Sequence, residues 1–344
     1  MDVKITGKRL KNTFSYDWVK LVAFAVAVIV LWSLLFTTCA TRATDGQQFY
    51  FVIYDDVVYD TDEVSTLMSD MKKDGALSYD VLTSQYNNVT KAGNYAALYM
   101  LNLRLTTKEG DVMIVNAGKL KTQADESDEK TDDGDTTGDG ENSSTEEKKD
   151  IDNILESGYG ADLTAFIRGA GSYVKKFTKD GSESGEIDEN KVTSYFMNTR
   201  VKSARNYKKT YTTDAKKEEG AKNEVIRIKN VQAAYLRVTA ALKKAEEAGK
   251  EIIRYWDKPE YGKNNEVVGT QKTAYGIDLT VLAEGSANKR ELVKDWWLVD
   301  ENQNTTTEGL TFCVLNCTRE DSDLQFESLT ALDYIIRTYS NYAD

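Results

Sequence analysis

The residues FYFVIY, Phe49–Tyr54, form a continuous apolar run that predicts a strand buried on both faces of a sheet. Apolar residues then recur at helical spacing over residues 64–71, and Gly75 is the expected stop of that helix. Further strands are predicted at Tyr79–Thr83 and Val112–Val115. Because parallel strands are joined by helical crossovers, this region predicts a βαβαβ unit, and the fold class is α/β with a mostly parallel sheet.

Upstream of this unit, LVAFAVAVIVLWSLLFTTCA, Leu21–Ala40, contains twenty residues without a charge. At about 1.5 Å rise per residue, a helix of this length spans the ~30 Å hydrocarbon layer of a membrane. Only Arg42 follows the run closely, whereas several basic residues precede it, and such an excess marks the cytoplasmic side. The sequence therefore predicts a single-pass protein of the cell membrane with a cytoplasmic N-terminus and an extracellular C-terminal domain. The basic residues before the run are Lys4, Lys8, Arg9, Lys11 and Lys20.

Two other interpretations of the apolar run stay open. A cleaved signal peptide has a shorter apolar core and a small-residue cleavage site, and this segment has neither. A lipoprotein signal is closer, because Cys39 lies at the end of the run and is a candidate for lipidation. Phe36 and Thr38 differ from the aliphatic and small residues expected before such a cysteine. Either anchor would tether the domain to the same face of the membrane.

Acidic residues are concentrated in the segment 122–150. It contains twelve acidic residues and three lysines, whereas the net charge of the whole chain is −12. A segment with no apolar residue larger than alanine cannot bury a core, so it is expected to be a disordered insertion. The chain is therefore divided into a basic leader (1–20), a transmembrane helix (21–40), and an extracytoplasmic α/β domain whose two parts, 41–121 and 151–344, flank this insertion.

Helices after the insertion are predicted near residues 163–168, over residues 231–245, and at the end of the chain, where Ser322 and Gln325 match a capping box. The basic stretch Arg200–Asn230 contains ten Lys or Arg against four acidic residues. We expect it to form a solvated helical face; outside the membrane it would meet cell-wall polymers or lipid headgroups and no nucleic acid. Strands are predicted at Ile252–Trp256, Tyr275–Leu282, Asp295–Val299 and Leu310–Thr318.

The chain contains no histidine. This absence removes the commonest general base, the usual partner of a catalytic serine or cysteine, and the commonest zinc ligand. Ser172 and Lys175 match the Ser-x-x-Lys motif of penicillin-recognising enzymes, but the same spacing recurs at Ser69, Ser127 and Ser286, and no Lys-Thr-Gly follows. We therefore expect a protein that is not an enzyme and uses no cofactor.

Ligand-binding residues are predicted at the carboxyl ends of the parallel strands, where open α/β sheets bind small molecules. Asp55 and Asp56 follow the first strand and Asn116 follows the third. Their oxygens would accept hydrogen bonds from sugar hydroxyls or amines. Trp296 and Trp297 are adjacent strand residues, so one of them would be exposed and offer a stacking face for a sugar. The alternative interpretation is that both tryptophans belong to the core and its rim.

A calcium site is a further hypothesis. Asp180, Ser182 and Ser184 match the alternating ligand positions of an EF-hand loop, and Gly185 matches its turn. Lys191 stands where the bidentate carboxylate belongs, and a polar turn explains the same residues without a metal.

The hexapeptides YGADLT, Tyr159–Thr164, and YGIDLT, Tyr275–Thr280, are similar, and we interpret them as two like junctions between a loop and an element rather than as a duplication. Together with EGDVMIVN, residues 109–116, the order of these segments resembles the first lobe of bacterial extracellular solute-binding proteins. With the anchor, the chain resembles uncharacterised membrane-anchored surface proteins of Gram-positive anaerobes with a truncated lobe of this kind.

The resemblance implies capture of a solute between two lobes, but the residues after Tyr275–Thr280 are too few for a second lobe. We therefore expect a membrane-tethered interaction or structural domain of the cell envelope, bound to the membrane through residues 21–40 and contacting envelope proteins or cell-wall polymers. The alternative is a tethered solute-binding-like module for sugars or peptides.

Overall fold

The computed structural model describes residues 18–39, 48–54, 61–78, 81, 83–88, 99, 103, 105–107, 110–116, 155, 158–201, 210–264, 266–284, 289–292, 309–316 and 326–343. The chain divides into two compact units, Met1–Ala43 and Thr44–Asp344. The predicted disordered insertion, 122–150, lies outside the described residues.

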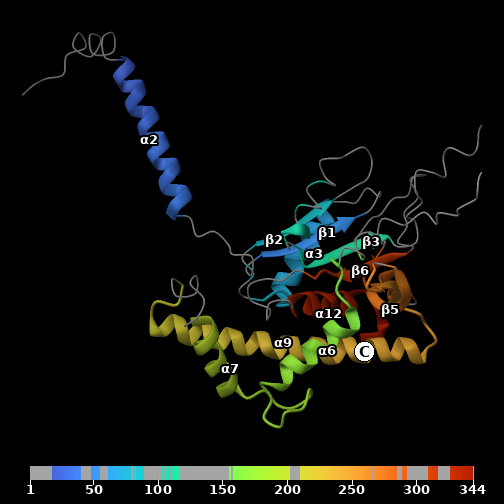
Figure 1. Cartoon of the computed structure of the whole chain (residues 1–344). Helices are drawn as coiled ribbons and strands as arrows, with labels where there is room; N and C mark the ends of the chain where they lie inside the picture. The colour runs from blue at the N-terminus through green and yellow to red at the C-terminus, as the bar shows by residue number, and fades with distance from the viewer. Residues whose placement is uncertain are drawn as a thin grey trace, which may run out of the picture. The chain divides into compact units, whose positions relative to one another are not determined.

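The first unit contains one described helix, α2, Trp18–Cys39, where the sequence predicts a helix (Figure 1). Its described side chains are exposed, and the large apolar ones include Phe24, Ile29 and Trp32. Within the residues that the structure describes, no helix reaches the length and apolarity that a membrane crossing needs.

The second unit is built on a six-stranded sheet with the order β2-β1-β3-β6-β5-β4 (Figure 1). β1 pairs with β2 and with β3 in parallel, and the three remaining pairs, β3 with β6, β6 with β5 and β5 with β4, are antiparallel. The strands are β1 Gln48–Tyr54, β2 Thr83–Asn88, β3 Val112–Asn116, β4 Ile253–Tyr261, β5 Val267–Asp278 and β6 Leu310–Val314.

The predicted parallel pairing of the first three strands is confirmed, and the structure gives their order as β2-β1-β3, but the prediction of a mostly parallel sheet is wrong. Every residue of β6 is buried, as in a central parallel strand, yet β6 runs antiparallel to β3. A continuous apolar run reports burial on both faces of a sheet and carries no information about strand direction. Strand bounds also differ: β2 begins at Thr83, where the predicted strand ends, and β5 ends at Asp278, where a helix begins. β4 continues beyond its predicted end to Tyr261, and β6 ends at Val314, before its predicted end.

Helices surround this sheet, and α9, Asp214–Glu247, is much longer than the predicted apolar stripe of residues 231–245. The final helix α12 begins at Glu327 with no side-chain cap, and the predicted capping residues Ser322 and Gln325 lie outside the described residues. The other helices are α3 Thr61–Asp74, α6 Leu163–Lys175, α7 Glu189–Tyr195 with the π-helix Phe196–Val201, α10 Leu279–Ala283 and the 3-10 turn Asn341–Ala343.

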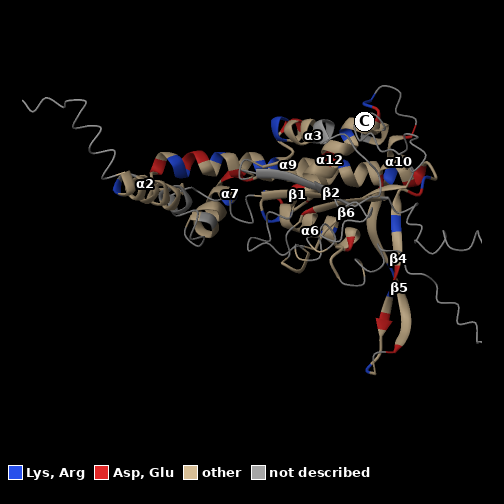
Figure 2. Cartoon of the chain, turned by 90° about the horizontal axis from the view of Figure 1, so that it is seen from above, with Lys and Arg blue, Asp and Glu red and all other residues tan. Residues whose placement is uncertain are grey.

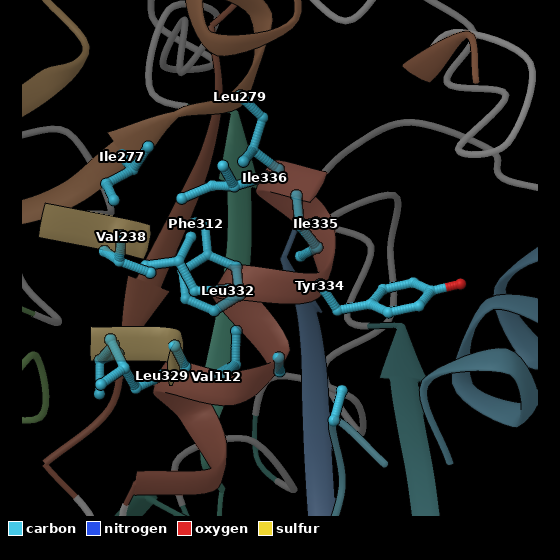
Figure 3. Close-up of a cluster of buried hydrophobic side chains, with 14 of the residues drawn as sticks. Val112, Val238, Ile277, Leu279, Phe312, Leu329, Leu332, Tyr334, Ile335 and Ile336 are labelled. Carbon is cyan, nitrogen blue, oxygen red and sulfur yellow. The ribbon is translucent and has the colours of Figure 1, made fainter. Parts of the chain in front are cut away.

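The main core lies between one face of the sheet and the helices α12 and α9 (Figure 3). Phe312 of β6 and Ile277 of β5 meet Leu332 and Ile336 of α12, and Val238 of α9 joins them. A second cluster covers the opposite face of the sheet, and a third joins α6, α7 and the N-terminal half of α9. All three clusters consist of residues from the second unit, so a fragment of residues 44–344 contains its complete described core.

The two similar hexapeptides form the like junctions that the sequence predicts. Asp162 caps α6 by accepting a hydrogen bond from the Ala165 N–H, and Asp278 caps α10 by accepting bonds from the N–H groups of Thr280 and Val281. The leucine that follows each aspartate is buried in the main core. In each hexapeptide the glycine lies opposite the β6 segment: Gly160 bridges to Leu315 and Gly276 pairs with Cys313.

Gly276→Ala is expected to destabilise the fold by about 1–3 kcal/mol, because the new methyl group would overpack β6. A Cβ at Gly276 would lie 2.6 Å from Thr311 Cγ2 and 2.8 Å from the Phe312 carbonyl oxygen. Gly269→Ala is the matched control on the same strand, since the nearest atom to its Cβ is Glu260 Oε2 at 3.4 Å. Urea unfolding of the fragment 44–344 measures both changes, and equal losses would contradict the packing argument.

Candidate interaction surface

The β4–β5 hairpin extends beyond the rest of the sheet, as Figure 2 shows. Of the residues of β5, only Gly276–Asp278 pair with β6. β4, in contrast, pairs with β5 along nearly the whole length of β5. The residues of β5 before Tyr275 therefore have one neighbouring strand, and at about 3.3 Å per residue this two-stranded part is about 25 Å long. We call it the ribbon: Tyr255–Tyr261, the connecting turn, and Val267–Ala274.

The ribbon leaves the sheet at a break in the strand register between Arg254 and Tyr255. Across this break Arg254 pairs with Gly276 and Tyr255 pairs with Ala274, so Tyr275 is the extra residue of a β-bulge. Its side chain is buried in the second core cluster. Bulges bend a strand and increase its twist, which accounts for the change of direction at this point.

The end of the ribbon exposes large apolar side chains. Tyr261 is 54% exposed, Val267 is 60% exposed and Val268 is 63% exposed. A second register break lies between Glu260 and Tyr261, and it leaves Val268 as another extra residue at the tip. An isolated two-stranded hairpin has marginal stability in water, so exposed apolar groups at its end favour a contact that covers them.

The outer strand of the ribbon is protected against strand addition. β4 is the last strand of the sheet, and it contains Pro259, which is the chain's single proline. A proline on an edge strand lacks the N–H that an added strand would need. We therefore expect a contact at the β4 edge of the ribbon to use side chains. The ribbon and its turn carry three acidic and three basic residues: Asp257, Glu260, Glu266, Lys258, Lys263 and Lys272.

The carboxyl ends of β1 and β3 lie at one edge of the sheet, as predicted, because Tyr54 pairs with Val115 in a parallel register. Asn116 is the last residue of β3, and its backbone also pairs with Leu310. Asp55 and Asp56 lie outside the described residues, as does the side chain of Asn116. The predicted ligand site at this edge stays a prediction.

The other residues predicted to bind a ligand or carry a lipid stay predictions, because their side chains are not described. Trp296 and Trp297, with their predicted strand, lie outside the described residues. Cys39 is the last residue of α2, and its side chain is not described. Cys313 is a free thiol buried in β6, and this burial raises its pKa well above the usual range. Cys313 is therefore a core residue and a poor nucleophile in the folded protein.

The structure brings together two of the three predicted calcium ligands. The N–H and the hydroxyl of Ser182 both donate to Asp180, each at 2.9 Å from Oδ1, whereas Ser184 is exposed and makes none of these bonds. The hydrogen bonds from Ser182 hold the pKa of Asp180 below its usual value, and the charge of Lys191 adds to this. The Lys191 ammonium donates to the Thr178 carbonyl at 2.6 Å, so a cation already occupies the base of this loop. Among the described residues no group of three His, Cys, Asp or Glu could hold a metal ion. Calcium binding stays a prediction.

A buried ionic cluster lies beside the third core cluster, and it was not predicted from the sequence. Arg227 of α9 is buried, and its guanidinium donates to Glu224 at 2.9 and 3.1 Å and to the Tyr173 hydroxyl at 2.8 Å. Glu327 of α12 lies 3.6 Å from the Arg227 Nη1, and its carboxylate oxygens accept no hydrogen bond. Burial by itself would lower the pKa of Arg227. Glu224, Tyr173 and Glu327 raise the pKa by more than burial lowers it, so the pKa lies well above its usual value. The sequence does contain one sign of this cluster: Glu224 and Arg227 are three residues apart on a helix, among apolar residues of the same face.

Tyr235 links α9 to the loop of the proposed calcium ligands. Its hydroxyl donates to Glu183 at 2.6 Å, and burial together with this bond raises the pKa of Tyr235 to about 12. A raised folded-state pKa gives stability that is complete below pH ~10 and is lost as the pH rises through ~12. The wild-type fragment is thus expected to lose about 1–2 kcal/mol more than Tyr235→Phe over this interval, because solvent screens part of the interaction. Urea unfolding at several alkaline pH values measures the difference, and parallel profiles would contradict it.

No protein-family model, curated protein or solved structure matches the chain.

Proposed function

We propose that this chain is a membrane-tethered, non-catalytic interaction domain of the cell envelope, and that the ribbon is the element that contacts its partner. The observation that supports this proposal best is the exposure of Tyr261, Val267 and Val268 at the end of a projecting hairpin. A structural contact of this kind needs no reactive group, which agrees with a chain that lacks histidine.

The character of the ribbon indicates the kind of partner. Its acidic and basic residues are equal in number, so it has no net attraction for an anionic cell-wall polymer. Aromatic and aliphatic groups at the centre of a contact, with charges around them, are typical of protein–protein interfaces. We therefore favour an envelope protein as the partner over a polymer.

We propose from the sequence that the uncharged segment Leu21–Ala40 is the tether and crosses the cell membrane with residues 1–20 in the cytoplasm; this segment continues beyond Leu34, the last α2 residue whose side chain is described. The exposed apolar side chains of α2 support this, since such a surface is stable in lipid and costly in water. Protease added to intact cells is expected to digest the region after Thr44. If the protease cuts this region only after the cells are opened, the proposed orientation is wrong.

Site-specific photocrosslinking of the full chain in its native membrane tests the ribbon. A photoreactive residue at position 261 or 268 is expected to form an adduct with one defined envelope protein. The control position is Leu236 of α9, an apolar residue that is 38% exposed on another element. Recovery of the chain as a lone monomer from positions 261 and 268, or equal adducts from position 236, would contradict the proposal.

A second candidate function is a tethered solute-binding-like module for sugars or peptides. The parallel strands β2, β1 and β3 favour it. β2 lies on one side of β1 and β3 lies on the other, so the strand order reverses between β1 and β3, and open α/β sheets bind ligands beyond the carboxyl ends of the strands at such a point. A thermal-shift screen of the fragment 44–344 with saccharides and peptides is the test. If no compound in a broad panel raises the unfolding temperature, this function is rejected.

A further inference from the structure

A groove follows the C-terminal half of α9, and it is distinct from the ribbon tip. Its walls are α6, α9 and the base of β4 and β5, and its volume is about 790 Å³. Along α9 it runs from Tyr235 to Glu246, which at 1.5 Å per residue is about 17 Å. Ligand sites in proteins commonly have volumes of about 300–1,000 Å³, so this groove has room for one small molecule. The apolar side chains that line it are Leu163, Ile167, Leu242, Ile252 and Ile253. Leu163 and Ile252 are buried in the main core, so the apolar surface open to a ligand comes from Ile167, Leu242 and Ile253.

Basic residues outnumber acidic residues in the lining of this α6–α9 groove. The basic residues are Arg168, Lys243, Lys250 and Lys272, and the acidic residues are Glu246 and Glu251. Lys243 and Lys250 are already paired, with Glu247 and Glu284, so two basic residues, Arg168 and Lys272, and two acidic residues, Glu246 and Glu251, remain in the lining.

The other two cations are available to a ligand. Lys272 lies over the Tyr255 ring at 4.4 Å from its centroid, and in the part of the chain that the structure describes Arg168 forms no ion pair with a carboxylate. Both side chains therefore offer positive charge beside an apolar strip.

We propose that the α6–α9 groove binds a single-chain amphiphile with an anionic head, such as an acyl carboxylate or an alkyl phosphate. The alkyl chain would lie on the apolar strip, where burial of its methylene groups supplies affinity in proportion to the area removed from water. The head would bind Arg168 and Lys272 through charge-assisted hydrogen bonds, and guanidinium groups suit carboxylate and phosphate oxygens. An apolar strip with two cations beside it, Arg168 and Lys272, matches this class better than a sugar, which has no extended apolar part.

Photolabelling of the full chain in its native membrane tests this proposal without separating the domain from its tether. The probe is dodecyl phosphate with a diazirine on the alkyl chain, and mass spectrometry locates the labelled peptides. Label is expected on the segments of α6 and α9 that line the groove. The double variant Arg168→Gln/Lys272→Gln is expected to need about tenfold more probe for the same labelling. Lys222→Gln, an exposed lysine in the N-terminal half of α9, is the matched control and should label like the wild type.

Three results would overturn the proposal: label located outside α6 and α9, unchanged labelling of the double variant, or equal labelling of the groove by a dodecyl trimethylammonium probe. Ile167→Asn tests the apolar strip, with its melting temperature measured first because Ile167 packs against the main core. A variant of the ribbon tip, Val268→Glu, should keep full labelling. Failure of the groove proposal is therefore distinguishable from failure of the proposed partner contact.

Discussion

Replacing Arg227 with methionine is expected to lower the free energy of unfolding of the fragment 44–344 by about 3–5 kcal/mol. The variant would leave Glu224 and Glu327 buried without their cation, and the Tyr173 hydroxyl would lose the group that donates to it. Removing one member of a buried ion cluster is costlier than removing the whole cluster, because the remaining charges stay desolvated. Urea denaturation followed by circular dichroism gives the difference directly.

Two further variants separate this explanation from a simple loss of packing. Arg237→Met is the matched control on the same helix: Arg237 is 39% exposed, and its partner Asp333 keeps a second cation, Arg337. Its expected cost is smaller, about 1–2 kcal/mol, because Asp333 keeps the charge of Arg337 when it loses the bonds from Arg237. The triple variant Arg227→Met/Glu224→Gln/Glu327→Gln is expected to recover much of the loss. If the triple variant is as unstable as Arg227→Met, lost packing rather than uncompensated charge explains the effect.

The parts of the fold that the sequence predicts correctly are those in which one local pattern decides the structure. The helix ending at Gly75 is confirmed, and Gly75 has φ +80°, a conformation that favours glycine. The strand predicted at Val112–Val115 and the helix predicted at the end of the chain are likewise confirmed, as β3 and α12. The direction of β6 was not predictable, because pairing between distant segments leaves no mark on the burial pattern of the strand itself.

The same reasoning explains why the ribbon was missed. In β4 only Ile252–Trp256 was predicted as a strand, while β4 continues to Tyr261 through Asp257, Lys258, Pro259 and Glu260, which show no alternation of polar and apolar residues. Pro259 argues against a central strand and is compatible only with an edge, which the sequence alone does not identify. The exposed apolar residues at the tip carry a signal only when their exposure is known, since the same valines and tyrosine would suit a core.

The double variant Tyr261→Glu/Val268→Glu is expected to weaken partner binding by at least about thirtyfold, which corresponds to about 2 kcal/mol. Apolar residues at the centre of an interface lose their contact area on such a change, and each carboxylate would be desolvated without a partner. Both side chains are more than half exposed in the free chain, so the fold itself should lose little stability. Quantitative crosslinking from a reporter at position 267 measures the binding.

The matched controls distinguish an apolar contact from an electrostatic one. Lys258→Gln changes a charge on the flank of the same ribbon and is expected to alter binding by less than about threefold, as rim charges usually do. Tyr261→Ser/Val268→Ser removes the apolar groups without adding charge and should weaken binding nearly as much as the glutamate pair. A large effect of the glutamate pair with none from the serine pair would mean that repulsion, and not loss of apolar burial, governs the contact. In that case the partner surface would have to be acidic, and the exposed apolar tip would not be the binding element.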